Sequence, residues 1–404
     1  MIRYGTRTIV IGVIIFVFGA GGFFVSRYLS LFEKNIPSGV IQKTGDQVGQ
    51  ISENTPGSSH SVPLEVETVV SGLEVPWSLA FTSDTRILVT ERPGRLRVVE
   101  DGVLQSQALF VFPEVSSQSE EGLMGLALDP EYKTNRFVYV SLAYKKGAEL
   151  AVKVVRLKDG GDVLNNPETI IDAIPAAAFH AGSRIKFGPD KMLYITTGDA
   201  TDKNIAQDVE NLGGKILRIH PDGTIPTDNP WPGNPVWSYG HRNPQGIAWH
   251  PVTGVMYATE HGPSVFDGPA GGDEVNRIVK SGNYGWPFVS HLNRRSGTIP
   301  PLLVFTPAEA PAGATFYTSA RIPQFTRQFF FTALKGEGIF RVAFDENNPD
   351  VVKEYEKLSE VNIGRIRDVA EGPDGALYFL TSNRDGRGKP AIGDDRIMRI
   401  VPKQ

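Results

Sequence analysis

Short apolar runs separated by turns recur along most of this chain, and their spacing is regular. Each copy begins with an apolar triplet, continues through a turn that contains Pro, Asp or Gly, and leads into further runs rich in β-branched and aromatic residues. Such runs are typical of β-strands. Successive copies start roughly 50–70 residues apart, which is a repeat length of β-propeller blades. The six triplets are Leu79–Phe81, Leu126–Leu128, Ile185–Phe187, Ile247–Trp249, Thr315–Tyr317 and Asp368–Ala370.

This repeat predicts an all-β protein with the architecture of a six-bladed β-propeller. One blade alone would not be stable, whereas neighbouring blades in a ring bury each other's faces. The last copy shows only three strands, and the alternating segment Leu64–Val70 (LEVETVV) precedes the first copy. We therefore expect Leu64–Val70 to supply the missing outer strand of the last blade and so to close the ring. The alternative, two stacked β-sandwich domains, would need hairpins without this period.

The N-terminal segment has the pattern of an export signal. Residues 9–25 form an unbroken apolar run with Gly and Ala, and Arg3 and Arg7 precede it. Basic residues before such a run favour insertion into a membrane. Residues 1–34 are therefore expected to be a membrane anchor, with a cleaved signal peptide as the alternative. The protein would lie outside the cytoplasmic membrane, periplasmic or at the cell surface, either anchored or, after cleavage, secreted.

Composition separates the remaining chain into two regions. Residues 35–62 are rich in Ser, Gly, Gln and Pro, which predicts a flexible linker with no core of its own. Residues 63–404 form the predicted propeller domain. The whole chain contains 43 Gly and 29 Pro among 404 residues, as a fold with many turns requires.

Charge and cysteine content exclude several kinds of function. The net charge is −4, so nothing general favours nucleic-acid binding. The absence of cysteine excludes disulfides, thiol catalysis, Cys-ligated zinc and iron–sulfur clusters. The sequence also lacks the HExxH motif of zinc hydrolases and the GxSxG elbow of serine hydrolases.

Polar residues gather directly before two of the expected inner strands. His180 precedes the third triplet, and Arg242 and Asn243, in YGHRNPQG, precede the fourth. At the mouth of a central channel, a histidine can act as a general base, and Arg242 and Asn243 can donate hydrogen bonds to a ligand. The structural alternatives are a histidine packed beneath a loop and an Asn-Pro turn.

A group of cations is expected in the fifth and sixth copies. Arg365 and Arg367 occupy alternate positions of a strand and therefore point the same way, and Lys335 stands in ALKGEG. Like charges on one face are costly unless they are solvated or face an anion. Together with Arg242 they would suit a ligand with several carboxylates. An ordinary solvated surface is the alternative.

An acidic, glycine-rich stretch supplies candidate metal ligands. Gly262 and Pro263 lie in EHGP, Asp273 and Glu274 lie in GGDE, and Tyr284 lies in GNYGWP. Carboxylates and loop carbonyls are the ligands that Ca²⁺ prefers, although the EF-hand spacing is absent here. These residues are therefore candidates for a calcium site.

Together these segments resemble the soluble sugar dehydrogenases that use pyrroloquinoline quinone (PQQ), the glucose/sorbosone or aldose dehydrogenase family. The resemblance spans residues 72–401, and GHRNPQG with the following EHGP and GGDE segments is its most diagnostic part. The family is six-bladed, in agreement with the repeat. The other matching segments are GLEVPWSLAF, EEGLMGLALDP, HAGSRIKFGPD, ITTGDA, GGKILRI, GNYGWP, ALKGEG and GRIRDVAEGPDGALYFLTS.

The resemblance implies roles for individual residues. His180 matches the catalytic base, and Arg242 would also stabilise charge during catalysis. The residues implied to contact PQQ are Glu120, which also lies near the substrate, Arg242, Asn243, Lys335, Arg365 and Arg367. The implied Ca²⁺ ligands are the carbonyls of Gly262 and Pro263 beside PQQ, and Asp273, Glu274 and Tyr284 at further calcium positions. Phe305 is expected to replace a Trp that relatives use as a stacking aromatic.

The resemblance further implies oxidation of the anomeric carbon of an aldose to a lactone. His180 would take the C1 hydroxyl proton while hydride passes to the quinone, and electrons would pass on to an extracytoplasmic acceptor that the sequence does not name. The protein would be a monomer or homodimer, attached to a membrane by its N-terminal segment and without a nucleic-acid partner. The alternatives are a Ca²⁺-dependent lactonase or other hydrolase, which needs no cationic group, and a non-catalytic propeller that binds a protein or glycan.

Overall fold

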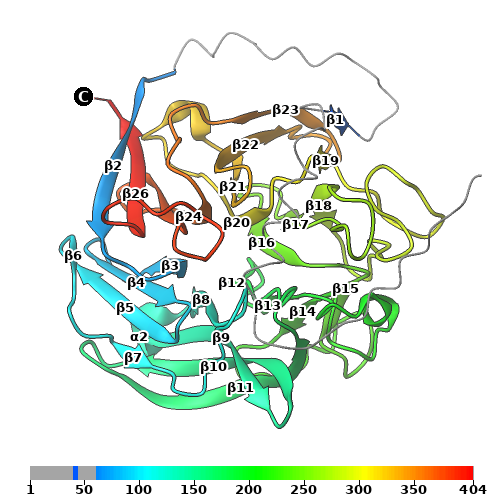
Figure 1. Cartoon of the computed structure of the whole chain (residues 1–404), viewed down its shortest axis with the longest axis horizontal. Helices are drawn as coiled ribbons and strands as arrows, with labels where there is room; N and C mark the ends of the chain where they lie inside the picture. The colour runs from blue at the N-terminus through cyan, green and yellow to red at the C-terminus, as the bar shows by residue number, and fades with distance from the viewer. Residues whose placement is uncertain (1–39, 44–60, 404) are drawn as a thin grey trace, which may run out of the picture. The chain divides into compact units, whose positions relative to one another are not determined.

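Six antiparallel sheets surround a central axis in the computed structural model, which describes residues 40–43 and 61–403 (Figure 1). Blade one contains β3 (Pro76–Phe81), β4 (Arg86–Glu91), β5 (Arg95–Glu100), β6 (Val103–Leu104) and β7 (Phe110–Val111). Blade two contains β8 (Leu123–Leu128), β9 (Phe137–Lys146), β10 (Glu149–Asp159) and β11 (Leu164–Ala176). Blade three contains β12 (Ile185–Phe187), β13 (Leu193–Thr197), β14 (Lys215–Ile219) and β15 (Val236–Tyr239).

Blades four to six continue the ring in sequence order. Blade four contains β16 (Pro244–Trp249), β17 (Met256–Glu260), β18 (Asp273–Ile278) and β19 (Leu303–Thr306), to whose outer edge β1 (Val40–Lys43) is paired. Blade five contains β20 (Pro311–Phe316), β21 (Phe329–Ala333), β22 (Gly338–Phe344) and β23 (Val352–Lys357). Blade six contains β24 (Ile366–Glu371), β25 (Leu377–Thr381), β26 (Arg396–Pro402) and β2 (Leu64–Ser71).

The innermost strand of each blade coincides with one of the apolar triplets of the repeat. These strands are β3, β8, β12, β16, β20 and β24, and they stand closest to the axis in Figure 1. Of the triplet residues, only Tyr317 falls outside its strand, one position after β20. The prediction of a six-bladed all-β propeller is therefore confirmed, and the alternative of two β-sandwiches is wrong.

The ring is closed by strands from the two ends of the propeller sequence. β2 pairs antiparallel with β26, so that Leu64 lies opposite Pro402 and Ser71 lies opposite Arg396. An ion pair of 2.7 Å between Arg399 Nε and Glu67 Oε2 accompanies the backbone pairing. The predicted role of Leu64–Val70 as the outer strand of the last blade is confirmed.

The core consists of apolar layers between neighbouring blades. Between blades four and five, Tyr257 stacks on Phe344 with ring centroids 4.0 Å apart. Phe305 lies in the same layer, 1% exposed, and its ring contacts Phe331 and Phe340. The expectation that Phe305 stacks at the cofactor site is therefore wrong: its side chain is occupied by the packing of blade four against blade five.

Most of the N-terminal region lies outside the described residues. This holds for the expected anchor or signal peptide at 1–34 and for the expected linker at 35–62, apart from residues 40–43 and 61–62. Residues 40–43 form β1, which pairs antiparallel with β19. Within the part of the chain that the structure describes, no helix combines the length and the apolar composition needed to cross a bilayer.

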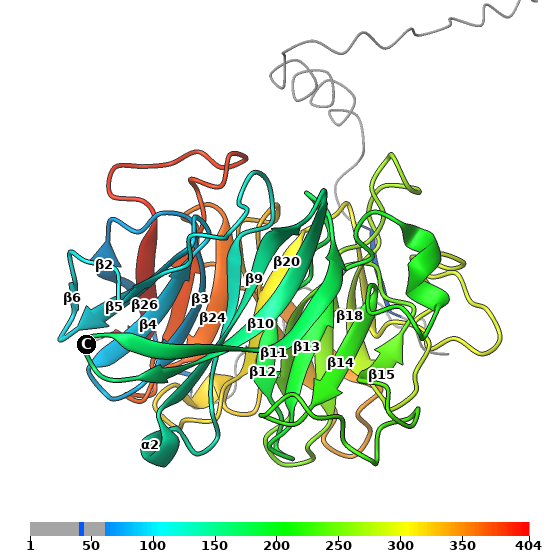
Figure 2. The ribbon, with the colours of Figure 1, turned by 90° about the horizontal axis from the view of Figure 1, so that it is seen from below.

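The blade topology brings several loops to one end of the ring. Because the first and second strands of a blade are antiparallel, the start of the first and the end of the second lie at the same end. In Figure 2 the long loop after β25 projects from that end, drawn in red. The helix α2 (Tyr132–Asn135), which follows the first strand of blade two, lies at the opposite end. Residues before inner strands and after second strands therefore share one face, here called the channel mouth.

Candidate functional site

His180 is held at the channel mouth by a chain of hydrogen bonds. Its Nδ1 lies 2.7 Å from Oδ1 of Asp199, and Oδ2 of Asp199 accepts a hydrogen bond of 2.8 Å from the indole N–H of Trp286. The carboxylate thus assigns the proton of the neutral imidazole to Nδ1. No hydrogen bond of Nε2 is found within the described residues, so this nitrogen is left as the proton acceptor.

The backbone around His180 is shaped for this contact. His180 has a φ of 59°, in the left-handed region that non-glycine residues rarely adopt and that is concentrated at functional sites. Gly198, directly before Asp199, approaches the His180 backbone so closely that a Cβ there would lie 1.9 Å from the His180 carbonyl oxygen. Any side chain at position 198 would push His180 and Asp199 apart.

Sequence reasoning did not assign a role to Asp199 or Trp286, although both lie in segments that it singled out. Asp199 follows β13, and His180 precedes β12, so the two ends of one hairpin place them side by side. Asp199 could have been predicted from the sequence, because it is a carboxylate that directly follows the second strand of the blade that carries His180. Trp286 comes from blade four, and nothing in the sequence indicates that it reaches blade three.

Glu120 lies next to His180, as the resemblance implied. Its Oε2 is 3.5 Å from the backbone N–H of His180, and its Oε1 is 2.8 Å from Nη1 of Arg387. Burial on its own would raise the pKa of Glu120, but the positive charge of Arg387 and those of neighbouring cations hold it below its usual value. Glu120 therefore carries a negative charge beside the imidazole.

Arg242 and Asn243 form the blade four side of the channel mouth. The guanidinium of Arg242 is buried and paired with Asp267, with 2.8 Å between Nε and Oδ2, and its backbone N–H donates to Glu260. Asn243 Oδ1 accepts a bond of 3.1 Å from the backbone N–H of Gly182. Asn243 Nδ2 is buried and has no hydrogen-bond partner among the described residues, so an amide donor stands ready for a ligand oxygen.

The three cations from blades five and six are placed differently from one another. Arg367 is buried, and its Nη1 donates to Gln245 Oε1 over 3.3 Å. Arg365 is also buried, but its guanidinium is paired at 2.6 Å with Asp385 and donates to the carbonyl of Leu334. The side chain of Lys335 is exposed. The structure thus brings the arginines to the channel mouth, with carboxylates beside two of them.

The carboxylates beside the cations were not foreseen from the sequence. Asp385 follows β25 and Asp267 follows β17, so both reach the channel mouth from loops after second strands. Burial would raise the pKa of Asp385, but Arg365 lowers it below its usual value. The positive charge at the channel mouth is therefore partly offset, and Arg367 is the arginine whose charge is least directly paired.

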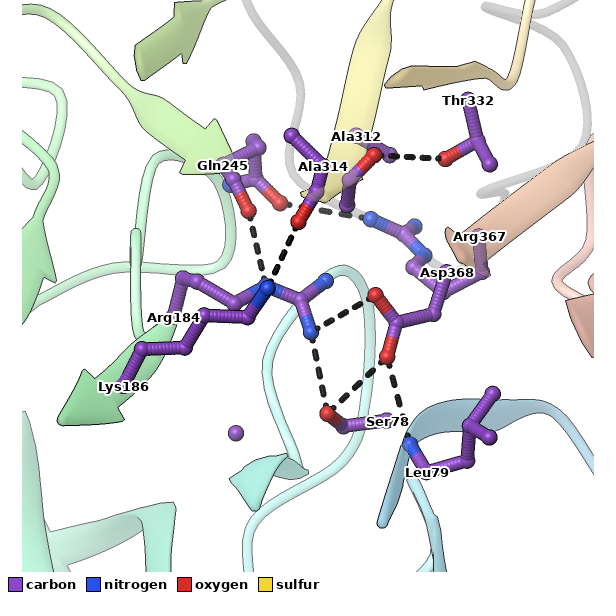
Figure 3. Close-up of polar contacts among 12 residues, drawn as sticks. Ser78, Leu79, Arg184, Lys186, Gln245, Ala312, Ala314, Thr332, Arg367 and Asp368 are labelled. Atoms are coloured by element: carbon purple, nitrogen blue, oxygen red, sulfur yellow. Dashed lines mark hydrogen bonds and ion pairs between the residues drawn. The ribbon is translucent and has the colours of Figure 1, made fainter. Parts of the chain in front are cut away.

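A network of buried polar groups fills the axis beneath the channel mouth (Figure 3). Arg184 Nη1 lies 3.0 Å from Asp368 Oδ1 and 2.9 Å from Ser78 Oγ, and its Nε donates to the carbonyl of Gln245. Lys186 Nζ donates to the carbonyl of Ala314 over 2.6 Å. These bonds tie β3, β12, β16, β20 and β24 together across the axis.

The candidate calcium ligands lie around a small cavity of about 10 Å³, next to Arg242. A water-sized volume of this order is needed to hold one water molecule or ion. Four of the five candidates line this cavity, namely Gly262, Pro263, Glu274 and Tyr284. Within the described residues, no group of three or more His, Asp and Glu side chains is arranged to hold a metal. A cation here would need backbone carbonyls in addition to the two carboxylates, Glu260 and Glu274, that line the cavity.

Asp273 and Tyr284 have structural partners in this region. The Asp273 carboxylate accepts hydrogen bonds from the backbone N–H groups of Gly262, Glu309 and Ala310, at 2.8, 2.7 and 2.7 Å. The Tyr284 hydroxyl donates to the carbonyl of Arg277 over 2.6 Å, and its ring stacks on His241. Asp273 thus stabilises the loop that carries Gly262, whereas Tyr284 contacts the end of β18 and His241; their role as metal ligands stays a prediction.

Glu274 carries a prediction about stability. Burial raises the pKa of Glu274 well above its usual value, and the opposing Glu260 on the neighbouring strand adds to the effect. The pKa of a glutamate in the unfolded chain is about 4.3. Above that pH the unfolded chain loses this proton while the folded protein keeps it, so the free energy of unfolding falls as the pH rises. We expect Glu274→Gln to raise Tm at pH 8 in EDTA by at least about 2 °C, and by less at pH 5. Scanning fluorimetry at both pH values checks this, and an equal or larger gain at pH 5 contradicts it.

Comparisons with known proteins identify the family of this chain. A sequence model of the family described as Glucose / Sorbosone dehydrogenase matches residues 73–397. This chain belongs to the glucose/sorbosone dehydrogenase family. The aldose sugar dehydrogenase of Escherichia coli is 33% identical over 347 residues, which cover 80% of this chain and 91% of that protein.

Two solved structures place the family resemblance in three dimensions. A putative oxidoreductase described as a glucose dehydrogenase from Thermus thermophilus is 42% identical, with a TM-score of 0.77 over 84% of this chain and 100% of that one. The PQQ-bound aldose sugar dehydrogenase of Streptomyces coelicolor is 34% identical, with a TM-score of 0.73 over 84% of this chain and 98% of that one. Membership of the glucose/sorbosone dehydrogenase family makes this protein an oxidoreductase of the PQQ-dependent sugar dehydrogenase type.

Proposed function

We propose that this protein oxidises the anomeric carbon of an aldose to a lactone with PQQ as its cofactor. The observation that carries the proposal is the His180–Asp199 pair, which leaves Nε2 as a proton acceptor at the same channel mouth to which the topology brings Arg242, Asn243 and Arg367. A hydrolase of this fold would need carboxylates round a central calcium, whereas the axis here is filled by the Arg184–Asp368 network.

The residues at the channel mouth have the chemical character that binding of PQQ requires. PQQ has several carboxylates and quinone oxygens, so it calls for cations and neutral donors. Arg367 supplies a buried positive charge with a weak protein partner, and Asn243 Nδ2 is a buried donor without one among the described residues. Arg242, Lys335 and Arg365 would be the remaining cations that contact the cofactor. Arg242 would then donate hydrogen bonds to both the cofactor and Asp267, and Arg365 to both the cofactor and Asp385.

Four residues of this chain have separate roles in the proposed reaction. When bound, PQQ would accept the hydride that leaves C1 of the sugar, and with it the two electrons of the oxidation. Nε2 of His180 takes the proton of the C1 hydroxyl, and Asp199 stabilises the imidazolium that forms. Arg242 keeps a positive charge in the buried site, where electrostatic stabilisation is strongest. Trp286 holds Asp199 in place through its indole N–H.

We further propose that Ca²⁺ binds at the cavity lined by Gly262, Pro263 and Glu274. The cavity has room for one ion and lies against Arg242, so an ion there would stiffen the loop that carries this arginine. Glu260 and Glu274 lie opposite each other on β17 and β18 and both line this cavity, so a cation there would offset the repulsion between them. Excess Ca²⁺ should then raise the Tm of the native protein more than that of Glu274→Gln.

The expected N-terminal anchor completes the proposal for the cellular role. With residues 1–34 in or exported across the membrane, the enzyme acts on the outer side of the cytoplasmic membrane. Electrons from the reduced cofactor pass there to a membrane or periplasmic acceptor. Fractionation of cells that express the full chain would test this, because an enzyme found wholly in the cytoplasm would contradict it.

The basic residues give a prediction about cofactor affinity. Arg367→Gln is expected to raise the Kd for PQQ about 10–100-fold, because it removes a charged hydrogen-bond donor from a buried site. Arg365→Ala should also weaken binding. Absorbance titration of each folded variant measures the Kd, with Arg341→Gln on the outer strands of blade five as the control. Native affinity in Arg367→Gln would remove this residue from the cofactor site.

The proposed function is tested by reconstituting the purified full-length protein with PQQ and Ca²⁺ and following reduction of an artificial dye with a panel of aldoses. Reduction that requires both additions and is lost in His180→Ala supports the proposal. A protein that neither binds PQQ nor reduces the dye contradicts it. Assays of lactone hydrolysis on the same preparation would then test the lactonase alternative.

A further inference from the structure

The loop after β17 places an exposed aromatic ring over the candidate base. Residues 263–268, here called the Phe266 loop, carry Phe266 with 66% of its surface exposed. Its ring centroid lies 5.9 Å from that of His180 with 25° between the ring planes, and 6.0 Å from the Arg242 guanidinium. Singly exposed apolar side chains are common on protein surfaces, so it is the position of Phe266 beside His180 and Arg242 that points to contact with a ligand.

The Phe266 loop is held in this position by its own polar contacts. Asp267 Oδ2 is paired with Arg242 Nε at 2.8 Å, and Asp267 Oδ1 accepts a bond of 2.7 Å from the backbone N–H of Ser264. The backbone N–H groups of Asp267 and Gly268 both donate to the carbonyl of Ser264, at 3.0 and 2.9 Å. The ring is therefore presented on a turn fixed at both ends rather than on a free chain.

The orientation of the two rings leaves the reacting edge of His180 open. The planes of His180 and Phe266 lie 25° apart with centroids 5.9 Å from each other, so the rings are close to parallel, and the apolar Phe266 ring offers no acceptor or donor that would occupy a nitrogen of the imidazole. Nδ1, on that edge, is taken by Asp199, so Nε2 is the open nitrogen. A sugar-sized molecule whose hydroxyl reaches Nε2 therefore comes close to the Phe266 ring, which is centred 5.9 Å from the imidazole.

We propose that Phe266 positions the sugar by packing its ring against the apolar C–H face of a cyclic aldose whose C1 hydroxyl is directed at His180. The inference rests on the proposed function and adds a preference within it. Pyranoses with a continuous C–H face gain this contact, whereas short open-chain aldehydes and polyols do not. Phe266 is a positioning residue, so it acts on the binding of the sugar and not on the transfer of the proton.

The test compares Phe266→Ala and Phe266→Tyr with the native holoenzyme. Loss of the ring should raise KM for pyranoses about 5–20-fold with kcat within about threefold, because uniform binding is lost. KM for glyceraldehyde should stay within about twofold, and Phe266→Tyr should restore the native KM. Phe288→Ala removes another exposed aromatic, whose ring contacts Arg295, and serves as the matched control.

A binding measurement separates this inference from the proposed function. Calorimetric titration of the holoenzyme with gluconolactone, which is not oxidised further, should show Kd raised by the same factor in Phe266→Ala. An active native enzyme with equal KM and equal lactone Kd in Phe266→Ala overturns the role of Phe266 alone. A fall in kcat without a change in KM assigns Phe266 to holding His180 and also overturns it. A native protein that binds neither PQQ nor lactone overturns both proposals.

Discussion

Replacing His180 with alanine is expected to lower kcat of the reconstituted enzyme about 10²–10⁴-fold, the usual weight of a general base. The open Nε2 of His180 is the proton acceptor that the geometry offers at the channel mouth, and alanine leaves the C1 hydroxyl without one. PQQ affinity should stay within about threefold, since the cationic residues that hold the cofactor are unchanged. Steady-state kinetics with saturating PQQ and Ca²⁺, together with absorbance titration of the cofactor, measure both quantities.

The pH dependence of the His180 variant provides the control. In the native enzyme a base that must be unprotonated makes kcat fall at low pH, and this fall should vanish in His180→Ala. His220→Ala, at the end of blade three's third strand, changes another histidine and should leave the profile unaltered. Near-normal turnover in His180→Ala, or an unchanged acidic limb, would mean that another group takes the proton.

Replacing Asp199 with asparagine is expected to lower kcat about 10²–10⁴-fold with little change in KM. The carboxylate holds the Nδ1–H tautomer, and an amide NH₂ in its place would favour the proton on Nε2, where the substrate needs an acceptor. The Ser-His-Asp triad, in which the equivalent Asp→Asn change costs about 10⁴-fold, sets the scale. The variant keeps the shape of the side chain, and its amide oxygen can still accept from the indole N–H of Trp286, at the loss of the single hydrogen bond from the Thr201 N–H to Oδ1, so the fold should be retained.

Two readouts separate positioning from damage to the fold in Asp199→Asn. Asp202→Asn alters an exposed carboxylate in the same loop and should behave as the native enzyme. The pH–rate profile should change in Asp199→Asn, because the imidazolium loses its charged partner. A variant with native kcat would show that His180 is oriented by other contacts. A variant that loses PQQ binding as well as kcat would point to a structural role for Asp199.

The repeat made the fold predictable because each blade carries its own signal. Asp368–Ala370 lies inside β24, as its position in the repeat predicted. Leu64–Val70 lies inside β2, because the last blade needed a fourth strand and this segment was available to close the ring. The position of site residues was also predictable in outline. Residues before inner strands share the channel mouth in any propeller, which is why His180 and Arg242 could be placed near each other.

The contacts within the site could not be predicted in the same way. Asp267 and Asp385 reach their partners through longer loops, whose lengths say nothing about side-chain direction. The pairing of Arg365 with Asp385 depends on how far one loop of blade six leans over another. The position of the apolar Phe305 side chain could not be predicted either. It enters the core because of the way in which blade four packs against blade five, where its ring contacts Phe340.

The pairing of β2 with β26 also constrains how the protein is made. Glu67 and Arg399, which meet across this seam, are 332 positions apart in the chain. At about 5–20 residues per second, a ribosome needs roughly 15–70 s to supply the last strand after the first has emerged. Throughout that interval β2 has an open edge, which is a template for pairing with another chain. We therefore expect truncated products that lack β26 to be aggregation-prone. During slow synthesis we expect a chaperone to be needed to cover the unpaired edge of β2.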